Sequence, residues 1–344
     1  MTHYSSPITV LLSNATFMKL LNSIPELATL QGPLVLVPGT MDGVHRGHQA
    51  LIYRGRQEAK KLGGTAVVMT FDQHPSTLLR PDKAPRLLTS TAQKLSLLEQ
   101  LGVERVLLLS FDQKLAATSA EEFIQQLVEQ NLKTICVGGE WIFGRGGKGN
   151  IALLHRLGEQ LKFSVIRIEP VEISNMRISS TNLRQAIASG HLIDAAAGLG
   201  RRYAIAGLVI EGAGRGKKIG YPTANLFIQK AQFPPFGVYT VRARAHGKTF
   251  SGVANIGVRP TVQKISSIST SHLNCCEATV EIHLFDFAGN LYGEEMELEL
   301  LSFLRPEKIF SSFDELKAQI AIDVEIAKKV ENSTSNNGQY SSTC

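Results

Sequence analysis

The stretch that most constrains the fold is an apolar run followed by a glycine-bearing turn and a helix. Residues Leu34 to Val37 are apolar at every position, which is typical of a parallel strand covered by helices on both faces. The turn follows directly, helix patterning runs from Arg46 to Leu62, and Gly63-Gly64 ends the helix. Open α/β sheets bind ligands at the carboxyl ends of their strands, so this turn is the first candidate binding site.

Two histidines stand at the start of that helix, with a glycine between them. His45 and His48 are three residues apart, which places them near one face of the first helical turn, and Gly47 leaves room for a ligand to approach the backbone. Imidazoles beside the free N–H groups of a helix start can donate hydrogen bonds to phosphoryl oxygens. Such histidines can also be ordinary polar residues. The strand and turn before them favour a polyphosphate site.

The composition is that of an ordinary globular chain, and it narrows the choice of partner. With 344 residues the chain can form two domains, each with its own core. The net charge of +6 allows an anionic partner, but the basic residues form no long tail, which favours a small phosphorylated substrate over nucleic acid. No apolar run reaches the length of a membrane span. Four cysteines without a Cys-x-x-Cys spacing favour reduced thiols, and we expect a cytoplasmic protein.

Strand and helix patterns alternate through the first half of the chain. The predicted strands are Thr65–Phe71, Arg105–Leu109, Lys133–Val137 and Leu161–Ile168, and the predicted helices are 89–101 and 119–130. This alternation predicts a doubly wound parallel sheet. Residues 138–150 place many glycines around Arg145 and Lys148, which indicates a mobile loop near phosphate, although a plain connector would have the same composition.

A cluster of hydroxyl side chains between two arginines begins another helix. Ser179, Ser180 and Thr181 lie between Arg177 and Arg184. Hydroxyl groups commonly cap helices, and that would explain the cluster itself. Capping alone does not account for the two arginines.

The secondary-structure pattern of the chain changes near Gly198 to Arg202. Short alternating stretches without intervening helices follow at 204–210, 237–243, 250–256, 278–285 and 295–303. Consecutive strands of this kind predict an antiparallel barrel or sandwich. We therefore expect domains at residues 1–198 and 199–330, the second closed by an amphipathic helix from Phe313 to Val330, with a polar, disordered tail at 331–344.

A second glycine-rich loop lies in this half of the chain. Gly212, Gly214 and Gly216 precede Lys217, and backbone N–H groups in such a loop can converge on an anion. The spacing does not match the Walker A loop, so a different phosphate loop is needed. The segment Pro222-Thr223-Ala224-Asn225 follows, and its Thr and Asn could also simply finish a turn.

Glu281 lies on one of the alternating strands, on the opposite side from Val280 and Ile282. A carboxylate that points into the mouth of a small barrel can take a proton from an attacking hydroxyl group. A solvated strand glutamate would show the same spacing. Spacing alone favours that second interpretation.

Three of these segments resemble one family. Residues 39–48 resemble the His-x-Gly-His segment of the nucleotidylyltransferase superfamily, and more closely that of the bifunctional bacterial riboflavin kinase/FMN adenylyltransferases, or FAD synthetases. Met41 stands where that family usually has Phe, and a large apolar side chain is retained. Residues 178–184 resemble its Ile-Ser-Ser-Thr-x-x-Arg motif, and residues 222–225 match the Pro-Thr-Ala-Asn motif of riboflavin kinases. The resemblance extends from about Leu20 to Lys329.

The resemblance implies an α/β chain with a Rossmann-like nucleotidylyltransferase domain followed by a β-barrel riboflavin kinase domain. His45 and His48 would stabilise the transition state of adenylyl transfer, and Glu281 would be the base that activates riboflavin. Thr223 and Asn225 would hold Mg²⁺ against ATP. The residues implied to bind ATP are Gly39, Asp42, Gly47, Arg177, Ser179, Ser180, Thr181 and Arg184 in the first domain, and Gly212, Gly214, Gly216, Lys217, Pro222, Thr223 and Asn225 in the second.

The expected partners are riboflavin, FMN and ATP, with Mg²⁺ as cofactor and at most a weak or transient homo-oligomer. We expect neither a nucleic-acid nor a membrane partner. An aminoacyl-tRNA synthetase-like enzyme shares the His-x-Gly-His turn, but it would need a Lys-Met-Ser-Lys-Ser-type loop and an anticodon-binding region, and the sequence has neither. The remaining alternative is a non-catalytic regulator that binds a flavin or a nucleotide.

Overall fold

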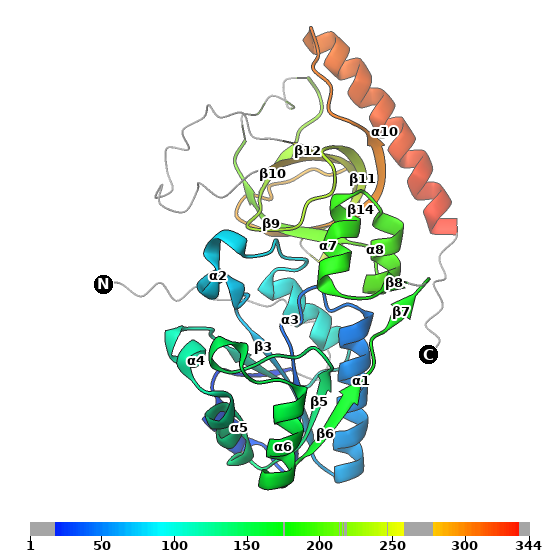
Figure 1. The fold of residues 1–344 in the computed structure, drawn as a ribbon. Coiled ribbons are helices and arrows are strands. Elements are labelled where there is room, and N and C mark those ends of the chain that lie inside the picture. Colours follow the sequence, from blue (N-terminus) through cyan, green and yellow to red (C-terminus); the bar gives the residue numbers. More distant parts are fainter. Residues whose placement is uncertain are drawn as a thin grey trace. The chain divides into compact units, whose positions relative to one another are not determined.

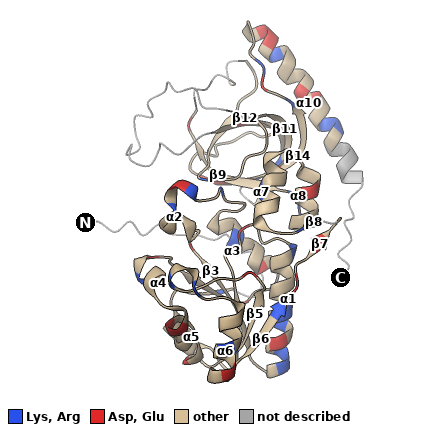
Figure 2. Ribbon diagram, viewed as in Figure 1, with Lys and Arg blue, Asp and Glu red and all other residues tan. Residues whose placement is uncertain are grey.

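The structure is a computed structural model that describes residues 18–174, 176–212, 214, 216, 219–245, 247–257 and 278–336, with side chains as far as 330. The chain divides into two compact units, Met1–Asn182 and Leu183–Cys344, called here the first and second unit (Figure 1). The sequence pattern instead puts a domain boundary after residue 198, and that boundary stays a prediction. Lys and Arg side chains are distributed over both units and interspersed with Asp and Glu (Figure 2).

The first unit contains a six-stranded parallel sheet with the strand order β1-β4-β3-β2-β5-β6. The strands are β1 Lys19–Leu21, β2 Leu34–Pro38, β3 Thr65–Phe71, β4 Arg105–Leu109, β5 Leu132–Gly138 and β6 Ser164–Ile168. The chain runs from β2 outward to β4 on one side, and then returns to add β5 and β6 on the other. The order therefore reverses between β2 and β5, which is where doubly wound sheets bind ligands. The predicted doubly wound parallel sheet is confirmed.

Both faces of this sheet are covered, which explains the apolar run of β2. Leu34 and Leu36 belong to one buried cluster, with Phe123 of α5. Val35 and Val37 belong to the other, with residues of α1 and α3. The helices of the unit are α1 Arg46–Leu62, α2 Ser76–Leu79, α3 Thr91–Gln100, α4 Gln113–Ala117, α5 Ala120–Val128 and α6 Ile151–Leu161, with short 3-10 helices at Ile24–Thr29, Pro81–Lys83 and Arg145–Gly147.

Helix α6 was not predicted, and it corrects the start of the strand predicted at Leu161–Ile168. The side chain of Asn150 accepts a hydrogen bond from the Leu153 N–H at 3.0 Å, so it caps the helix. Leu161 is the last helical residue, and Lys162 adopts a left-handed conformation with φ 63°. Because the chain turns at Lys162, the strand begins at Ser164.

The loop predicted to be mobile at 138–150 is anchored by its aromatic residues. Phe143 is buried, its ring stacks on that of Trp141 at 4.4 Å, and its backbone pairs with Gly149. The aromatic side chains therefore hold this loop against the first unit.

The second unit contains a closed antiparallel barrel in the order β10-β13-β12-β11-β14-β9, which confirms the predicted barrel. Its strands are β9 Ala204–Ile210, β10 Ala224–Phe227, β11 Gly237–Ala245, β12 Lys248–Gly257, β13 Thr279–Leu284 and β14 Glu295–Arg305. The hairpin β7 Glu172–Ile173 and β8 Met176–Arg177 and the helices α7 Ser180–Ala188 and α8 Leu192–Leu199 precede the barrel in the chain. No helix among the described residues is long and apolar enough to cross a membrane.

The helix α10, Phe313–Asn336, packs on the outside of the barrel. Its Ala327 joins a buried cluster with Val238 and Val253 of the barrel. Its Asp323 accepts hydrogen bonds from the guanidinium group of Arg305 on β14, at 2.7 Å to Nη2. The helix continues past the predicted end at Val330, and the rest of the predicted disordered tail, from residue 337, lies outside the described residues.

Candidate active sites

The turn after β2 has an unusual backbone for its residue types. Met41, Gly43 and Val44 all adopt positive φ angles, of 53°, 83° and 41°. Only glycine tolerates this region easily, and a β-branched residue such as Val is a true outlier there. Met41 and Val44 are buried, so the retained apolar side chain at position 41 fills the core as expected. Backbone strain of this kind persists only where the surroundings fix it, and it concentrates at functional sites.

Hydrogen bonds to the side chain of Asp42 hold this turn in its strained conformation. Its carboxylate accepts hydrogen bonds from the backbone N–H groups of Leu88, at 2.9 Å, and Thr89, at 3.1 Å. The Thr89 hydroxyl group accepts a bond from the Gly43 N–H at 3.0 Å. Asp42 is only 4% exposed, so the structure gives its carboxylate a holding role. The contact with nucleotide that the family resemblance implies stays a prediction.

His45 caps α1, and the cap determines which ring nitrogen can donate. Its Nδ1 accepts a hydrogen bond from the His48 N–H at 3.3 Å, so in the neutral ring the proton is on Nε2. Gly47 lies beside this ring, and a Cβ atom at position 47 would make a tight contact with His45 Cε1, at 3.1 Å. Helix α1 therefore presents His45 as a hydrogen-bond donor.

His48 stacks on His45, with ring centroids 3.7 Å apart and planes 16° from parallel. Burial, and then the nearby His45 and Lys94, lower the pKa of His48 well below the usual 6.5. Its Nδ1 is buried and has no hydrogen-bond partner among the described residues. Because buried polar atoms nearly always have a partner, this nitrogen is suited to a polar ligand. A neutral His48 can donate one hydrogen bond without carrying a charge.

The predicted hydroxyl cluster is only partly brought to this turn. Ser180 Oγ donates to the Asp42 carbonyl at 3.0 Å, and Ser179 Oγ accepts from the Asn182 N–H, which caps α7. Arg177 is turned toward Glu140, at 2.6 Å. Thr181 is exposed, and Arg184 lies on α7 in the second unit. Ser180 thus joins this cluster to the histidine turn.

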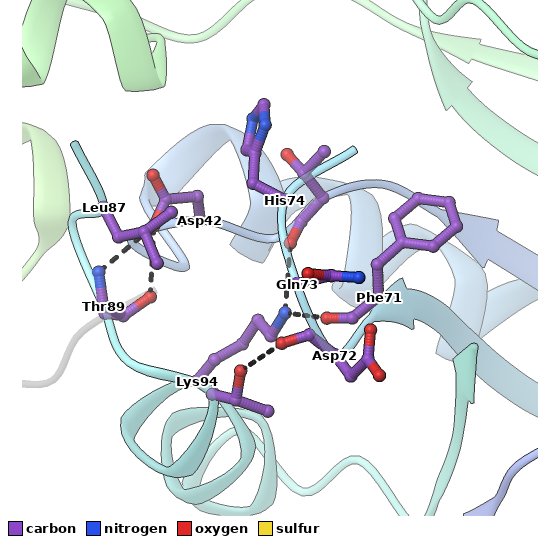
Figure 3. A pocket seen from close by; sticks show the side chains of 10 residues that line it. Asp42, Phe71, Asp72, Gln73, His74, Leu87, Thr89 and Lys94 are labelled. Carbon is purple, nitrogen blue, oxygen red and sulfur yellow. Dashed lines mark hydrogen bonds between the residues drawn. The ribbon is translucent and has the colours of Figure 1, made fainter. Parts of the chain in front are cut away.

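A small pocket lies at the carboxyl ends of β2 and β3 (Figure 3). Most of the residues that line it have polar side chains. The lining residues are Thr40, Asp42, Phe71, Asp72, Gln73, His74, Leu87, Thr89, Thr91 and Lys94. This is the sheet edge at which the sequence predicts a ligand, and it adjoins the turn that carries the two histidines.

Lys94 is the residue of this cavity that sequence reasoning missed. It extends from α3 between Asp42 and Asp72 (Figure 3) and is 7% exposed. Its Nζ donates to the Phe71 carbonyl at 2.5 Å and approaches the Thr40 carbonyl at 3.5 Å. Burial lowers the pKa of Lys94 to about 8, against the opposing effect of the two aspartates. The available signal was a lysine on the apolar face of a helix, one turn before the buried Leu98.

The second site is built on the outside of the barrel. Glu281 on β13 pairs with Asn225 on β10 and with Asn255 on β12. Directly paired residues point to the same face of a sheet. Val280 and Ile282 fill the barrel interior, whereas Glu281 is exposed. The predicted alternation is confirmed, because Glu281 lies on the face opposite to Val280 and Ile282, but that face is the outside of the barrel and not its mouth.

The glycine loop passes close to Thr223 and Asn225. A Cβ atom at Gly212 would lie 2.0 Å from Asn225 Nδ2, and one at Gly216 would lie 3.2 Å from Thr223 Oγ1. Only glycine permits so close an approach. Gly214 adopts a φ of 66°, and Lys217 lies outside the described residues. The structure thus brings Gly212 and Gly216 close to Thr223 and Asn225, and Asn225 lies beside Glu281.

His283 holds the segment that begins this site, and sequence reasoning gave it no role. Its Nδ1 donates to the Pro222 carbonyl at 2.9 Å, and its ring meets that of Tyr221 edge to face at 5.2 Å. The signal was again available in the alternation, because His283 is two residues from Glu281 and shares its face.

The donor set at this site fits Mg²⁺. A Thr hydroxyl, an Asn carbonyl and a carboxylate on the neighbouring strand are hard oxygen ligands, and Mg²⁺ in nucleotide sites completes its shell with phosphate oxygens and water. In the part of the chain that the structure describes, no group of three or more His, Cys, Asp and Glu side chains could hold a metal ion.

Comparisons with known proteins cover both units. Residues 28–182 match the family model of FAD synthetase, and residues 199–331 match that of riboflavin kinase. The bifunctional riboflavin kinase/FMN adenylyltransferase of Escherichia coli K12 is 40% identical over 310 residues, which cover 89% of this chain and 96% of that one. The enzyme of the same name from Pseudomonas fluorescens is 36% identical over 313 residues, which cover 90% and 97%.

A solved structure from Streptococcus pneumoniae, named as a macrolide-efflux protein, is 30% identical with a TM-score of 0.75, and covers 91% of this chain and 99% of that one. The fold of both units thus recurs in a single solved chain. With two family models matched in sequence order and relatives aligned over most of their length, the chain belongs to the family of bifunctional riboflavin kinase/FMN adenylyltransferases.

Proposed function

We propose that this protein phosphorylates riboflavin with ATP to give FMN, and then adenylylates FMN with a second ATP to give FAD and pyrophosphate. One observation carries the proposal. Each unit contains its own cluster of side chains with chemistry suited to phosphate, and each cluster falls within the matching family model. A non-catalytic regulator is the alternative, and it would not need the catalytic side chains of both clusters.

For adenylyl transfer, a phosphate oxygen of FMN attacks the α-phosphorus of ATP, and the bond from that phosphorus to the bridging oxygen of the β-phosphate breaks. Negative charge builds on the non-bridging oxygens and on the departing pyrophosphate. Nε2–H of His45, fixed by its cap, and the neutral ring of His48 are the donors proposed to stabilise that charge. Both act by hydrogen bonding, and neither forms a bond to phosphorus.

For the kinase reaction, we propose Glu281 as the general base. It takes the proton of the riboflavin 5′-hydroxyl group as that oxygen attacks the γ-phosphorus, and ADP leaves. The pairing of Glu281 with Asn225 supports this role, because it sets the carboxylate beside the phosphate-handling segment. When bound by Thr223 and Asn225, Mg²⁺ would neutralise charge on the phosphates. His283 contributes by holding Pro222 at the start of that segment.

The remaining parts of the proposal concern the setting. We propose Mg²⁺ as the working metal, riboflavin, FMN and ATP as the ligands, and the cytoplasm as the compartment. We also propose that the enzyme works without nucleic-acid or membrane partners and that any homo-oligomer is weak or transient.

Turnover tests the proposal directly. Purified protein is incubated with riboflavin, ATP and Mg²⁺, and FMN, FAD and pyrophosphate are followed over time. We expect FMN first and FAD after it, and FMN supplied alone with ATP should give FAD. EDTA should stop the kinase step. Binding of flavin and ATP without any product would overturn both activities in favour of the regulator.

A further inference from the structure

A buried lysine in the first unit is not explained by stability. Removing an ammonium group from water costs several kcal/mol unless its partners compensate, and an apolar side chain of similar volume is often as good or better. Lys94 occupies a helix position that faces the sheet together with Leu98. A methionine would fill this space without that cost. Stability therefore does not explain why a charged lysine occupies this position.

The two carbonyl groups that Lys94 contacts mark where its charge acts. Phe71 is the last residue of β3, and Thr40 lies two residues beyond the end of β2. Both carbonyls therefore lie at the carboxyl ends of neighbouring strands. The Thr40 carbonyl also accepts a bond from the Thr70 hydroxyl group at 2.8 Å. Lys94 and Thr70 thus join the ends of two neighbouring strands at one point.

That point is where the strained turn begins. Thr40 immediately precedes Met41, the first residue with a positive φ, and the turn then leads through Asp42 to His45. Asp42 is fixed from the other side by the backbone of Leu88 and Thr89. The turn is therefore held at both of its ends, and Lys94 provides the charged contact at the first.

We propose that Lys94 is a positioning residue for adenylyl transfer, whose ammonium group ties the ends of β2 and β3 together and thereby fixes the turn that carries His45 and His48. This inference rests on the proposed adenylylation of FMN. The charge of Lys94 also acts at a distance. It faces the carboxylates of Asp42 and Asp72, shares its cavity with His74, and opposes protonation of His48.

Asp72 supports this reading of the cavity. One carboxylate oxygen accepts a bond from the Ser110 hydroxyl group at 2.7 Å, whereas the other, Oδ1, is buried without a partner in the described part of the chain. The charge of Asp72 attracts the Lys94 ammonium group, but the hydrogen bonds of that group go to the backbone carbonyls of Phe71 and Thr40. Its hydrogen bonds are directed to the strand ends, as a positioning role requires.

The test compares Lys94→Met, Lys94→Arg and the control Lys60→Met, an exposed lysine on α1. Each preparation is assayed for both reactions, and the fluorescence of Trp141 reports whether the first unit is folded. We expect Lys94→Met to lower kcat for FAD formation by roughly 10- to 100-fold, with little change in KM, because a small misplacement of catalytic groups costs this much. The kinase rate and Lys60→Met should match wild type, and Lys94→Arg should recover part of the loss.

The pH profile separates positioning from simple packing. Wild-type FAD formation should decline above about pH 8, as Lys94 loses its proton, and Lys94→Arg should move that decline to higher pH. In Lys94→Met the acid limb should move to higher pH, because His48 then protonates more easily. Thr70→Val removes the other donor to Thr40 without changing charge, so it should lower kcat by a few-fold and leave both limbs in place.

If Lys94→Met fails to fold, Thr70→Val and Lys94→Arg still test the inference. An unchanged profile in Lys94→Arg, or a Lys94→Met enzyme with wild-type kcat, would overturn the inference alone. Wild-type protein that formed FMN but no FAD would overturn the proposed adenylylation, and this inference with it.

Discussion

The two sites of this chain are built in opposite ways. In the first unit, His45, Asp42 and Lys94 are buried near the carboxyl ends of β2 and β3 in a parallel sheet. In the second, Glu281 is exposed on the outer face of a closed barrel, with Asn225 half-buried on the next strand. One site is enclosed by its own sheet and helices, and the other is displayed on a surface.

This difference decides what each site depends on. Buried donors act in a low dielectric, where each hydrogen bond to developing charge is stronger, but their placement depends on packing. An exposed carboxylate depends less on packing and more on what the metal and the nucleotide bring to it. The adenylyl-transfer site should therefore respond to core substitutions, and the kinase site to changes of ligand and metal.

The largest effect should come from the exposed site. Glu281→Gln removes the proposed base with little change of shape, so the kinase rate should fall roughly 10²- to 10⁴-fold, the usual contribution of general base catalysis. FAD formation from supplied FMN should remain within twofold. The control is Glu295→Gln, another exposed strand glutamate of the barrel. Equal losses in both reactions would show that the two sites are not separate.

At the buried site, His48→Ala should lower FAD formation by roughly 10²- to 10³-fold, the cost of removing one donor from a charge-stabilising site. FMN formation should be unaffected. His155→Ala on α6, an exposed histidine of the same unit, is the matched control. If His48→Ala changed KM for ATP but not kcat, the residue would bind the ground state, and the proposed role in the transition state would be wrong.

A substitution in one unit should lower the stability of that unit to urea more than that of the other unit. Asp323→Ala leaves Arg305 without its carboxylate, and breaking a buried pair of this kind costs about 3 kcal/mol. Kinase activity should then be lost at lower urea concentration. The fluorescence of Trp141, the single tryptophan, reports the first unit and should shift less. Glu325→Ala, which breaks an exposed pair with Lys329, should have almost no effect.

The smallest effect should be a pH dependence of the first unit. The unfolded chain protonates His48 near its usual pKa of 6.5, whereas the folded protein lowers that pKa, so protons favour the unfolded state. The stabilisation is complete above the unfolded pKa and is lost as pH falls below it, by at most about 1.4 kcal/mol per pH unit. Urea unfolding followed by Trp141 fluorescence should show a flatter dependence in His48→Gln. Parallel curves would mean that His48 is not buried in the neutral form.

Prediction from the sequence succeeded where the signal is local. The bounds of β3, β4, β9 and α1 are confirmed as predicted, because apolar alternation, helix periodicity and the glycine after α1 each occur within a few residues. It failed for β10, because residues 224–227 pair with β9 and β13 but were not among the predicted strands.

The sites were harder to predict, because they depend on contacts between distant residues. The motifs located both histidines, Thr223, Asn225 and Glu281, and their chemical roles stay predictions. The predicted face of Glu281, opposite to Val280 and Ile282, is confirmed, but the strand pattern did not show that this face is the outside of a closed barrel. Lys94 and His283 act on backbone carbonyls far away in the chain, at Phe71 and Pro222, and backbone acceptors leave no sequence signature.

The left-handed conformation of Val44 limits how portable the histidine motif is. A designer who grafts only residues 39–48 onto another scaffold would transfer the imidazoles without the donors from 88–89, Thr70 and Lys94 that oppose relaxation. The grafted segment would relax to ordinary dihedral angles, and the rings would separate. The smallest transplantable piece is therefore a three-part assembly drawn from distant stretches of the chain, and short pattern matches elsewhere deserve suspicion unless those supports accompany them.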